Sequence, residues 1–259
     1  MIDTHCHIDA AEFDGDREDA VEAARAAGVD CIVVPSVARD NFGAVASVCR
    51  GHPQCRPAWG IHPMYVDRAR DEDLGAVAEF VARAEAVAVG EIGLDRFVES
   101  RDDARQARFF AAQLGIAREA DLPVLLHVRR AVDAVLVHLR RTRVVGGIAH
   151  AFNGSIDQAQ QFIKLGFKLG FGGAMTHPRA HRLRELAATL PLDALVLETD
   201  SPDIPPAWLA GGRNSPAELP RIAAELAGLR GISCEDLIAR TTANALAVLP
   251  RLASSAHGA

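Results

Sequence analysis

The sequence predicts a (β/α)8 TIM barrel, and three observations support this. Short, β-branched apolar runs alternate with longer, alanine-rich amphipathic segments, which is the pattern of parallel βαβ units. We count eight such runs, at residues 2–5, 30–36, 56–62, 86–93, 122–128, 144–151, 167–173 and 194–200. A chain of 259 residues is long enough to close eight units into one barrel.

Helical periodicity is clearest between these runs at residues 16–28, 105–120 and 155–166. Residues 215–249 are expected to form one or two closing helices, and residues 250–259 a frayed tail. No linker or composition shift marks a second domain, so we expect a single domain over residues 1–259. The rival fold is a doubly wound open sheet, which requires a glycine-rich phosphate loop after the first strand; the sequence lacks one.

Composition excludes several classes of protein. The net charge is −6, so the molecule is not a general cation that would coat nucleic acid. No apolar stretch is long enough to span a bilayer, and the first residues do not resemble a secretory signal. We therefore expect a cytoplasmic protein without membrane contact. The five cysteines are scattered with no CxxC pair, and we expect free thiols.

Ionisable side chains gather where the predicted strands end. They are His5, His7, His62, Glu91, His127, His150 and Asp200. In a barrel, the carboxyl ends of all strands meet at one face, where catalytic groups collect. His5 and His7 occupy alternate positions, so both can face the same side of one strand.

This set of donors predicts a metal site. Nitrogen and oxygen ligands without cysteine suit Zn, Mn, Mg or Fe. Six ligands exceed the number that one tetrahedral site needs, whereas two ions sharing a bridging carboxylate would use all six. Such a pair, roughly 3.5–4 Å apart, suits hydrolysis with an activated water. The structural alternative is a set of buried ion pairs, for example with Arg129.

The motifs DTHCHID, GIHP, VGEIGLD, LPVLLHVRR, HAFNGS, GFGGAMTHPRA, LETDSPDIPP and RNSP occur in this order. Together they resemble the TatD family of metal-dependent deoxyribonucleases, over nearly the whole chain. The pairing of HVRR with GGAMTHPRA is most similar to the shorter, TatD-related branch of metallohydrolases. The resemblance implies a TIM barrel of the amidohydrolase type and hydrolysis of DNA from its 3′ end with two divalent ions (Mg, Mn or Zn). Some relatives are reported to deacylate mischarged tRNA.

The resemblance also implies roles for the clustered residues. One ion would be held by His5, His7, Glu91 and Asp200, and the second by Glu91, His127 and His150, with Glu91 bridging. Asp200 would also orient or deprotonate the attacking water. His62 would face the scissile phosphate and protonate the leaving group.

Contacts to the substrate are implied at Asp95, Arg129, Asn153, Arg213 and Asn214, together with His62. The chain departs from the family pattern at two places. HAFNG replaces the usual HCFSG, which alters the substrate contact at Asn153. Arg96 stands between the GLD motif and Phe97, where an aromatic residue often follows directly.

A phosphate-tracking groove would need cations and aromatic faces near the barrel mouth. Basic candidates are Arg129, Arg130, Arg179 and Arg182, of which the last two are equally compatible with an ordinary solvated helix. Candidates for base stacking are Phe97, Phe152, Trp208 and Tyr65.

Two other functions fit the sequence less well. The first is a metallohydrolase of another ester or amide on the same barrel, such as an aminoacyl-tRNA deacylase or small phosphoesterase. Many such enzymes bridge their metals with a carbamylated lysine, and neither Lys164 nor Lys168 ends a strand here. The second is a non-catalytic binding protein, although no expected ligand is missing. The sequence indicates no obligate protein partner, so a monomer is the default expectation.

Overall fold

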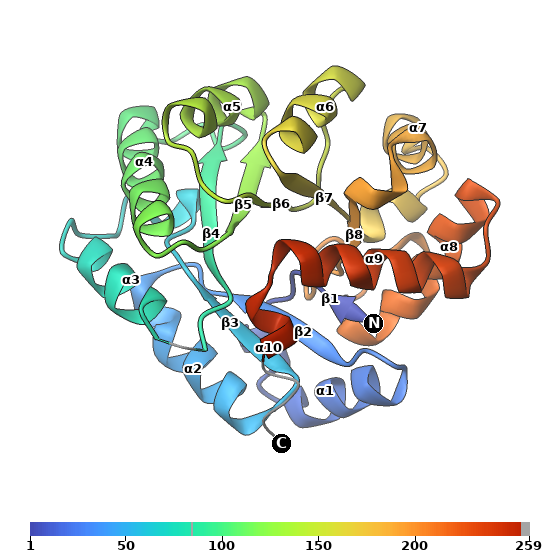
Figure 1. The fold of residues 1–259 in the computed structure, drawn as a ribbon. Helices are drawn as coiled ribbons and strands as arrows, with labels where there is room; N and C mark the ends of the chain where they lie inside the picture. Colours follow the sequence, from blue (N-terminus) through green and yellow to red (C-terminus); the bar gives the residue numbers. More distant parts are fainter. Residues whose placement is uncertain (84, 255–259) are drawn as a thin grey trace.

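The computed structural model describes residues 1–83 and 85–254, and it has the predicted barrel architecture (Figure 1). Eight parallel strands pair in sequence order from β1 to β8. The strands are β1 (Ile2–Asp3), β2 (Cys31–Pro35), β3 (Cys55–Trp59), β4 (Ala88–Asp95), β5 (Val124–Arg129), β6 (Gly147–Ala149), β7 (Phe167–Phe171) and β8 (Leu195–Leu197). Each lies within or beside one of the predicted runs, because a parallel strand covered on both faces is a continuous apolar segment.

Helices cover the outside of this sheet (Figure 1). They are α1 (Arg17–Ala26), α2 (Phe42–Gly51), α3 (Asp73–Val81), α4 (Asp103–Glu119), α5 (Val132–Arg141), α6 (Ile156–Lys164), α7 (His181–Thr189), α8 (Leu219–Arg230), α9 (Cys234–Val248) and α10 (Arg251–Ser254). The helices α8 and α9 are the closing helices expected between residues 215 and 249. No helix in the described part of the chain is both long and apolar enough to cross a bilayer.

The barrel is nearly closed between β8 and β1 without a regular ladder. The backbone N–H and hydroxyl of Thr4 both donate to the carbonyl oxygen of Leu197, at 3.1 and 3.0 Å. Just beyond, the N–H of Asp200 donates to the carbonyl oxygen of His5 at 2.8 Å. These bonds bring the ends of the first and last strands together, although nearly 200 residues separate them.

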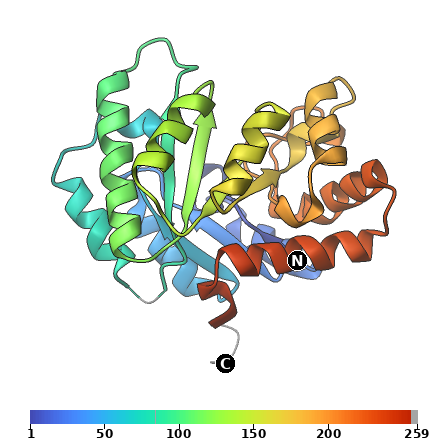
Figure 2. The same cartoon turned by 45° about the horizontal axis from the view of Figure 1, so that its top comes forward.

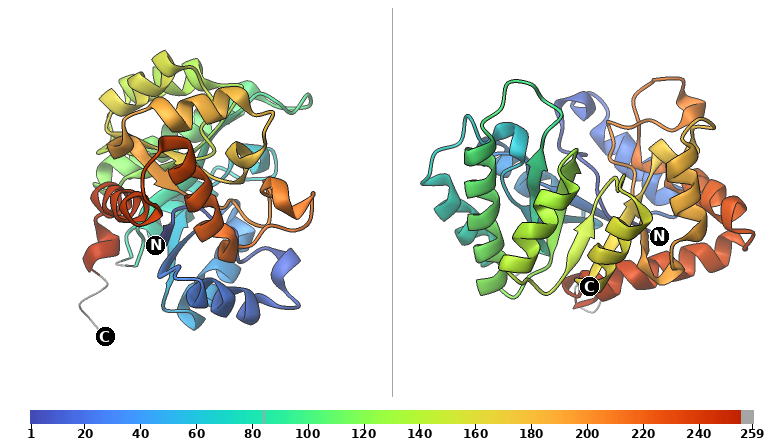
Figure 3. Two further views of the ribbon diagram at one scale, coloured as in Figure 1. Left: turned by 90° about the vertical axis from the view of Figure 1, so that its right-hand side faces the viewer. Right: turned by 90° about the horizontal axis from the view of Figure 1, so that it is seen from above.

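The amino end of the barrel is plugged by α9. Inward-facing strand residues, including Val33, Leu125 and Val196, form one apolar cluster with Ala245 and Val248 of α9. In Figure 2 and in the right-hand view of Figure 3, α9 runs along one edge of the barrel, and the loops after β4 and β8 rise at the opposite edge. The amino end of the barrel is therefore covered by α9, and a cavity opens at the carboxyl end.

The end of the chain differs from the expectation of a frayed tail from residue 250. Arg251–Ser254 form α10, and Leu252 is only 7% exposed in the cluster beneath the barrel. The Arg251 guanidinium donates to the carbonyl oxygen of Ala86 at 2.9 Å. Burial of one leucine and this bond explain why the helix forms; residues 255–259 lie outside the described part.

Candidate metal centre

A cavity of about 1280 Å³ opens at the carboxyl end of the barrel. The ends of all eight strands contribute to its lining, so residues far apart in sequence share one space. The predicted cluster lies at its floor: His7, His62, Glu91, His127, His150 and Asp200 line the cavity. His5 lies just beneath them and is fully buried.

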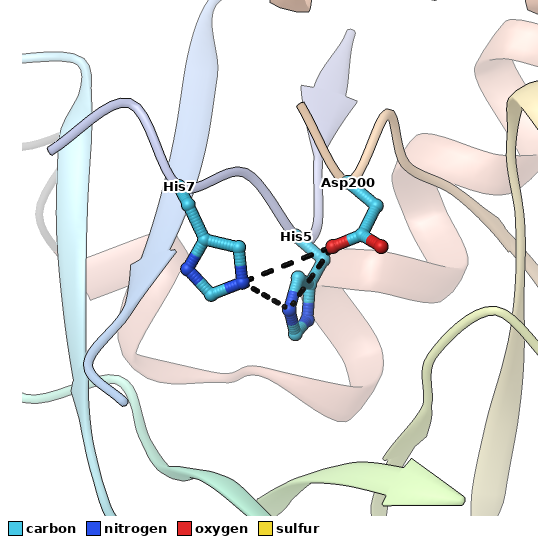
Figure 4. A group of neighbouring side chains, drawn as sticks. All are labelled: His5, His7 and Asp200. Atoms are coloured by element: carbon cyan, nitrogen blue, oxygen red, sulfur yellow. Dashed lines mark hydrogen bonds and ion pairs between the residues drawn. The ribbon is translucent and has the colours of Figure 1, made fainter. Parts of the chain in front are cut away.

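One oxygen of Glu91 faces the histidines of the first strand. Oε2 of Glu91 lies 3.2 Å from Nε2 of His5 and 3.4 Å from Nε2 of His7. The two imidazole nitrogens are 3.3 Å apart. The carboxylate of Asp200 completes this group, with Oδ1 at 3.7 Å from His5 and 3.8 Å from His7 (Figure 4).

The other oxygen of Glu91 faces three further imidazoles. Oε1 lies 2.9 Å from Nε2 of His150, 3.0 Å from Nδ1 of His127 and 3.4 Å from Nε2 of His62. Glu91 thus stands between two groups of donors, one on each carboxylate oxygen. This is the arrangement that a bridging carboxylate requires.

The histidines around Glu91 fall into two groups, one with a lowered pKa and one with a raised pKa. The side chain is buried, which disfavours ionisation, but the imidazoles of His62, His150 and His5 hold its pKa well below the usual range. Burial lowers the pKa of His5 to about 3 and that of His62 to about 4. Burial has the same tendency at His7 and His150, but Glu91 outweighs it and raises their pKa to about 9 and about 10.

The residues fit divalent cations. Among residues 1–83 and 85–254, three groups have ligand atoms within 4.8 Å of one another: His5, His7 and Asp200; His5, Glu91 and His150; and His62, Glu91 and His127. Five ring nitrogens converge on the two oxygens of one buried carboxylate. One carboxylate cannot bond so many nitrogens, whereas cations placed between these donors would be coordinated by them.

Asp95 supports the centre from the neighbouring side of β4. Its Oδ2 lies 2.8 Å from Nε2 of His127, the ring nitrogen that points away from Glu91. Asp95 is fully buried and does not line the cavity. It therefore contacts a candidate ligand and not the substrate; such partners orient metal-binding histidines.

Asp3 plays a comparable part at the barrel closure, and sequence reasoning did not assign it a role. Its carboxylate accepts the N–H of Thr199 at 3.0 Å, the hydroxyl of Thr199 at 2.6 Å and the N–H of His5 at 3.2 Å. Burial raises its pKa to about 7. Asp3 thereby ties the segment carrying His5 to the segment carrying Asp200.

Glu198 is a second residue that the sequence reasoning missed. It is 1% exposed; Oε1 accepts the N–H of Ala151 at 2.5 Å and lies 3.9 Å from Nδ1 of His150. Burial raises its pKa to about 8. The sequence did contain a signal for Glu198. It stands in an apolar run two residues before Asp200, and alternate residues of a strand face the same side, so both carboxylates could be expected to point the same way.

The predicted substrate contacts divide into two groups. Arg129 and Asn153 are exposed and line the cavity, and the buried His62 lines it as well. Arg213 is turned away: its guanidinium donates to both carboxylate oxygens of Asp16, at 2.6 and 2.7 Å. The structure does not bring Arg213 to the cavity.

Asn214 is fully buried and lies outside the cavity lining as well. Its Nδ2 donates to the carbonyl oxygens of Thr199 at 2.8 Å, Asp203 at 2.9 Å and Ile204 at 3.3 Å. It therefore shapes the loop that carries Asp200, whose backbone has a left-handed φ of 57°.

Only some of the other arginine and aromatic candidates line the cavity. Arg130 and Arg182 line the cavity and Arg179 does not. Among the aromatic candidates, Phe97, Tyr65 and Phe152 line it, although Phe152 is buried. Trp208 lies elsewhere, with its Nε1 donating to Glu218 at 2.7 Å.

A parallel β/α barrel with imidazoles and carboxylates clustered at the carboxyl ends of its strands defines a metal-dependent barrel hydrolase. The chain belongs to the TatD family, since residues 2–250 match the family model described as TatD related DNase. It is thus a metal-dependent hydrolase acting on ester bonds.

Individual relatives agree with this assignment. The chain is 41% identical to the uncharacterized metal-dependent hydrolase YjjV of Escherichia coli K12, over 89% of this chain and 90% of that protein. It is 33% identical to the 3′-5′ ssDNA/RNA exonuclease TatD of Cronobacter sakazakii, over 99% and 100%. The crystal structure of the E. coli TatD homologue YjjV superposes with a TM-score of 0.92 at 38% identity, covering 96% of this chain and 98% of that one.

Proposed function

We propose that this protein hydrolyses phosphodiester bonds at the 3′ ends of single-stranded DNA with two divalent metal ions. The position of Glu91 between two groups of imidazoles is the observation that carries the proposal. A single ion would need only one of these groups. The name of the exonuclease relative favours a nucleic acid as the substrate.

The proposed ligands follow the two faces of Glu91. His5, His7 and Asp200 would hold one ion with Oε2 of Glu91, and His127 and His150 would hold the other with Oε1. Zn, Mn and Mg all suit such donors. When bound, the ions lower the pKa of a water molecule and stabilise the charge that develops on the phosphate.

The chain's own residues position the reacting groups. Asp200 lines the cavity beside His5 and His7, so its carboxylate can accept a proton from the attacking water. Nδ1 of His62 accepts the N–H of Met64 at 3.1 Å, which places the ring proton on Nε2, facing Glu91 and the cavity. His62 can thus donate a hydrogen bond to the leaving oxygen. Arg129 and Asn153, on the rim, would contact the phosphate and the neighbouring nucleotide.

The test uses single-stranded DNA labelled at its 5′ end. Protein reloaded with Mg²⁺, Mn²⁺ or Zn²⁺ should shorten the strand stepwise from the 3′ end, and the Glu91→Gln variant should not. Duplex DNA, RNA, an aminoacyl ester and a simple amide serve as competing substrates. Metal-dependent hydrolysis of the ester or amide without shortening of DNA would replace the proposal with the alternative metallohydrolase function.

A further inference from the structure

Four exposed residues form a surface beside the cavity at the carboxyl ends of β4 and β5. We define them as the arginine ledge: Arg96, Phe97, Arg129 and Arg130. Phe97 is 44% exposed, and the guanidinium carbons of Arg129 and Arg130 lie 3.7 and 4.6 Å from the centroid of its ring. The ledge therefore combines a partly exposed aromatic ring, over which two guanidinium groups lie, with three positive charges.

The charges of the ledge are not neutralised within the protein. In the part of the chain that the structure describes, no carboxylate pairs with Arg96, Arg129 or Arg130, and none of the three guanidinium groups donates a hydrogen bond. By contrast, Arg213, in the loop after β8, is paired with Asp16. Unpaired arginines side by side repel one another, so an anion bound among them would be favoured.

The ledge extends the cavity beyond the metal centre. A second, smaller cavity of about 230 Å³ lies next to the large one, and Arg130 and Val132 line both. Arg96, Gln158 and Asp133 form part of its wall, and the Asp133 carboxylate accepts a hydrogen bond from Gln158 at 2.8 Å. A chain of phosphates leaving the large cavity at Arg130 would therefore meet a second hollow whose lining has two arginines and one carboxylate.

The side of the rim across the barrel from the ledge carries acidic residues. Asp9 and Glu12, after β1, and Asp203, after β8, line the cavity on the side across the barrel from the ledge. Arg182 on α7 also lines it, and its guanidinium donates to Asn153. A polyanion is thus attracted to the ledge and repelled from the acidic side. We therefore expect it to leave the cavity on the side of the ledge.

Asp95 fixes the ledge relative to the candidate metal centre. Its Oδ1 accepts the N–H of Phe97 at 2.7 Å and of Val98 at 3.4 Å, while Oδ2 contacts His127. The N–H of Arg96 donates to the carbonyl oxygen of Arg129 at 2.9 Å. The ledge is consequently a rigid continuation of β4 and β5.

We propose that the arginine ledge binds the part of a single-stranded polynucleotide that lies outside the reacting end, with phosphates on the arginines and a base on Phe97. This rests on the proposed function and specifies how that site would hold a long substrate. Guanidinium groups match phosphate oxygens, and aromatic faces stack any base without regard to sequence. In this chain Arg96 stands between the GLD motif and Phe97, so the ledge contains an arginine at a position where an aromatic residue often follows GLD directly.

The test measures binding separately from hydrolysis. The full-length protein is kept in a chelator, so that the strand is not cut, and its affinity for fluorescent single-stranded DNA is followed by anisotropy over a range of salt concentrations. For a single strand, each phosphate contact contributes about −0.7 to the slope of log K against log salt. Replacing two ledge arginines in R96Q/R130Q should therefore make the slope shallower by about 1.4.

Matched variants control for net charge and for stacking. R50Q/R118Q removes two exposed arginines that do not line either cavity, and its slope should equal that of the wild type. Phe97→Leu should weaken binding on the order of tenfold with the slope retained, since stacking is not ionic. All variants are first checked for native circular dichroism.

The outcomes separate the ledge from the hydrolysis. Equal slopes of log K against log salt for R96Q/R130Q and the R50Q/R118Q control would contradict polynucleotide binding at the ledge, even if the metal-loaded protein shortens DNA. Equal competition by polyglutamate would overturn it too, because the surface would then bind any polyanion. A shallower slope for R96Q/R130Q, without metal-dependent shortening of DNA, would support binding at the ledge and contradict the proposed hydrolysis.

Discussion

The carboxylate of Asp95 lies 2.8 Å from Nε2 of His127, while Nδ1 of the same ring lies 3.0 Å from Glu91. His127 is therefore held from both sides, by residues of the adjacent strand β4. Asp95 thus reaches the candidate metal centre through this one imidazole.

Asp95→Asn should consequently weaken metal binding. Loss of a carboxylate behind a metal-binding histidine costs about 10–100-fold in affinity or activity. Titration with a chelating dye as competitor measures the affinity directly. Asp73→Asn is the matched control, because Asp73 is a buried carboxylate that accepts the N–H of Arg70 away from the cavity. Affinities of the two variants within twofold of each other would contradict the role of Asp95.

Glu91→Gln should remove activity almost completely. The amide keeps the shape of the side chain but loses the charge shared by the two groups of imidazoles. Metal activation supplies several kcal/mol of transition-state stabilisation, so we expect a loss in kcat on the order of 10³-fold or more. Metal content by mass spectrometry should fall with it. A variant that retains two ions per chain and wild-type kcat would show that Glu91 is not a bridging ligand.

Asn214→Ala should unfold more easily than the wild type, although Asn214 matches a motif expected at the substrate. Its side chain bonds the carbonyl oxygens of Thr199, Asp203 and Ile204, and each buried group left unpaired costs about 1–3 kcal/mol. Urea unfolding measures the loss. Arg213→Ala, next in sequence, breaks an exposed ion pair and should change stability little. Equal stability of the two variants would contradict this distinction.

This contrast shows what the sequence can and cannot predict. The strands were recognisable because buried parallel strands are apolar runs, and the ligands because ionisable groups such as Glu91 end those runs. A motif, however, does not give the direction of a side chain. Arg213 and Asn214 were expected at the substrate, but one turns to Asp16 and the other into the loop after β8.

Other residues escaped sequence reasoning for a different reason. Asp3 and Glu198 have partners in distant segments, Thr199 and Ala151, which only the closed barrel brings near. The apolar run around Glu198 indicates burial, but the partners of both carboxylates could not be deduced from their neighbours in sequence. The helical end of the chain was likewise unexpected, because its stability comes from the packing of Leu252 against the base of the barrel.

Removal of metal should lower the thermal stability of the protein. A ligand that binds only the folded state at about 100 times its Kd stabilises it by about 2.7 kcal/mol. For a chain of this size, each kcal/mol shifts Tm by about 2–4 °C, so a chelator should lower Tm by roughly 5–10 °C. Calorimetry with and without re-added Mn²⁺ checks this. The Glu91→Gln variant should not respond, and an equal response would place the stabilising ion elsewhere.

The same substitution at two glycines should have opposite effects on stability. At Gly170 on β7, an added Cβ would lie 2.0 Å from Oε2 of the buried Glu198. Overpacking of this kind costs about 1–3 kcal/mol, so Gly170→Ala should destabilise the protein. In α4, a Cβ at Gly115 meets no atom within 4 Å, and alanine is better than glycine in a helix by about 0.5–1 kcal/mol.

Urea unfolding of Gly170→Ala and Gly115→Ala measures both effects against one wild type. Because Glu198 contacts the loop that follows His150, Gly170→Ala should also reduce metal affinity, whereas Gly115→Ala should leave it unchanged. Destabilisation by both substitutions would mean that helix packing at Gly115 is tighter than the open space beside it indicates. A stable Gly170→Ala variant with full metal affinity would mean that Glu198 moves freely and does not hold the wall of the metal centre.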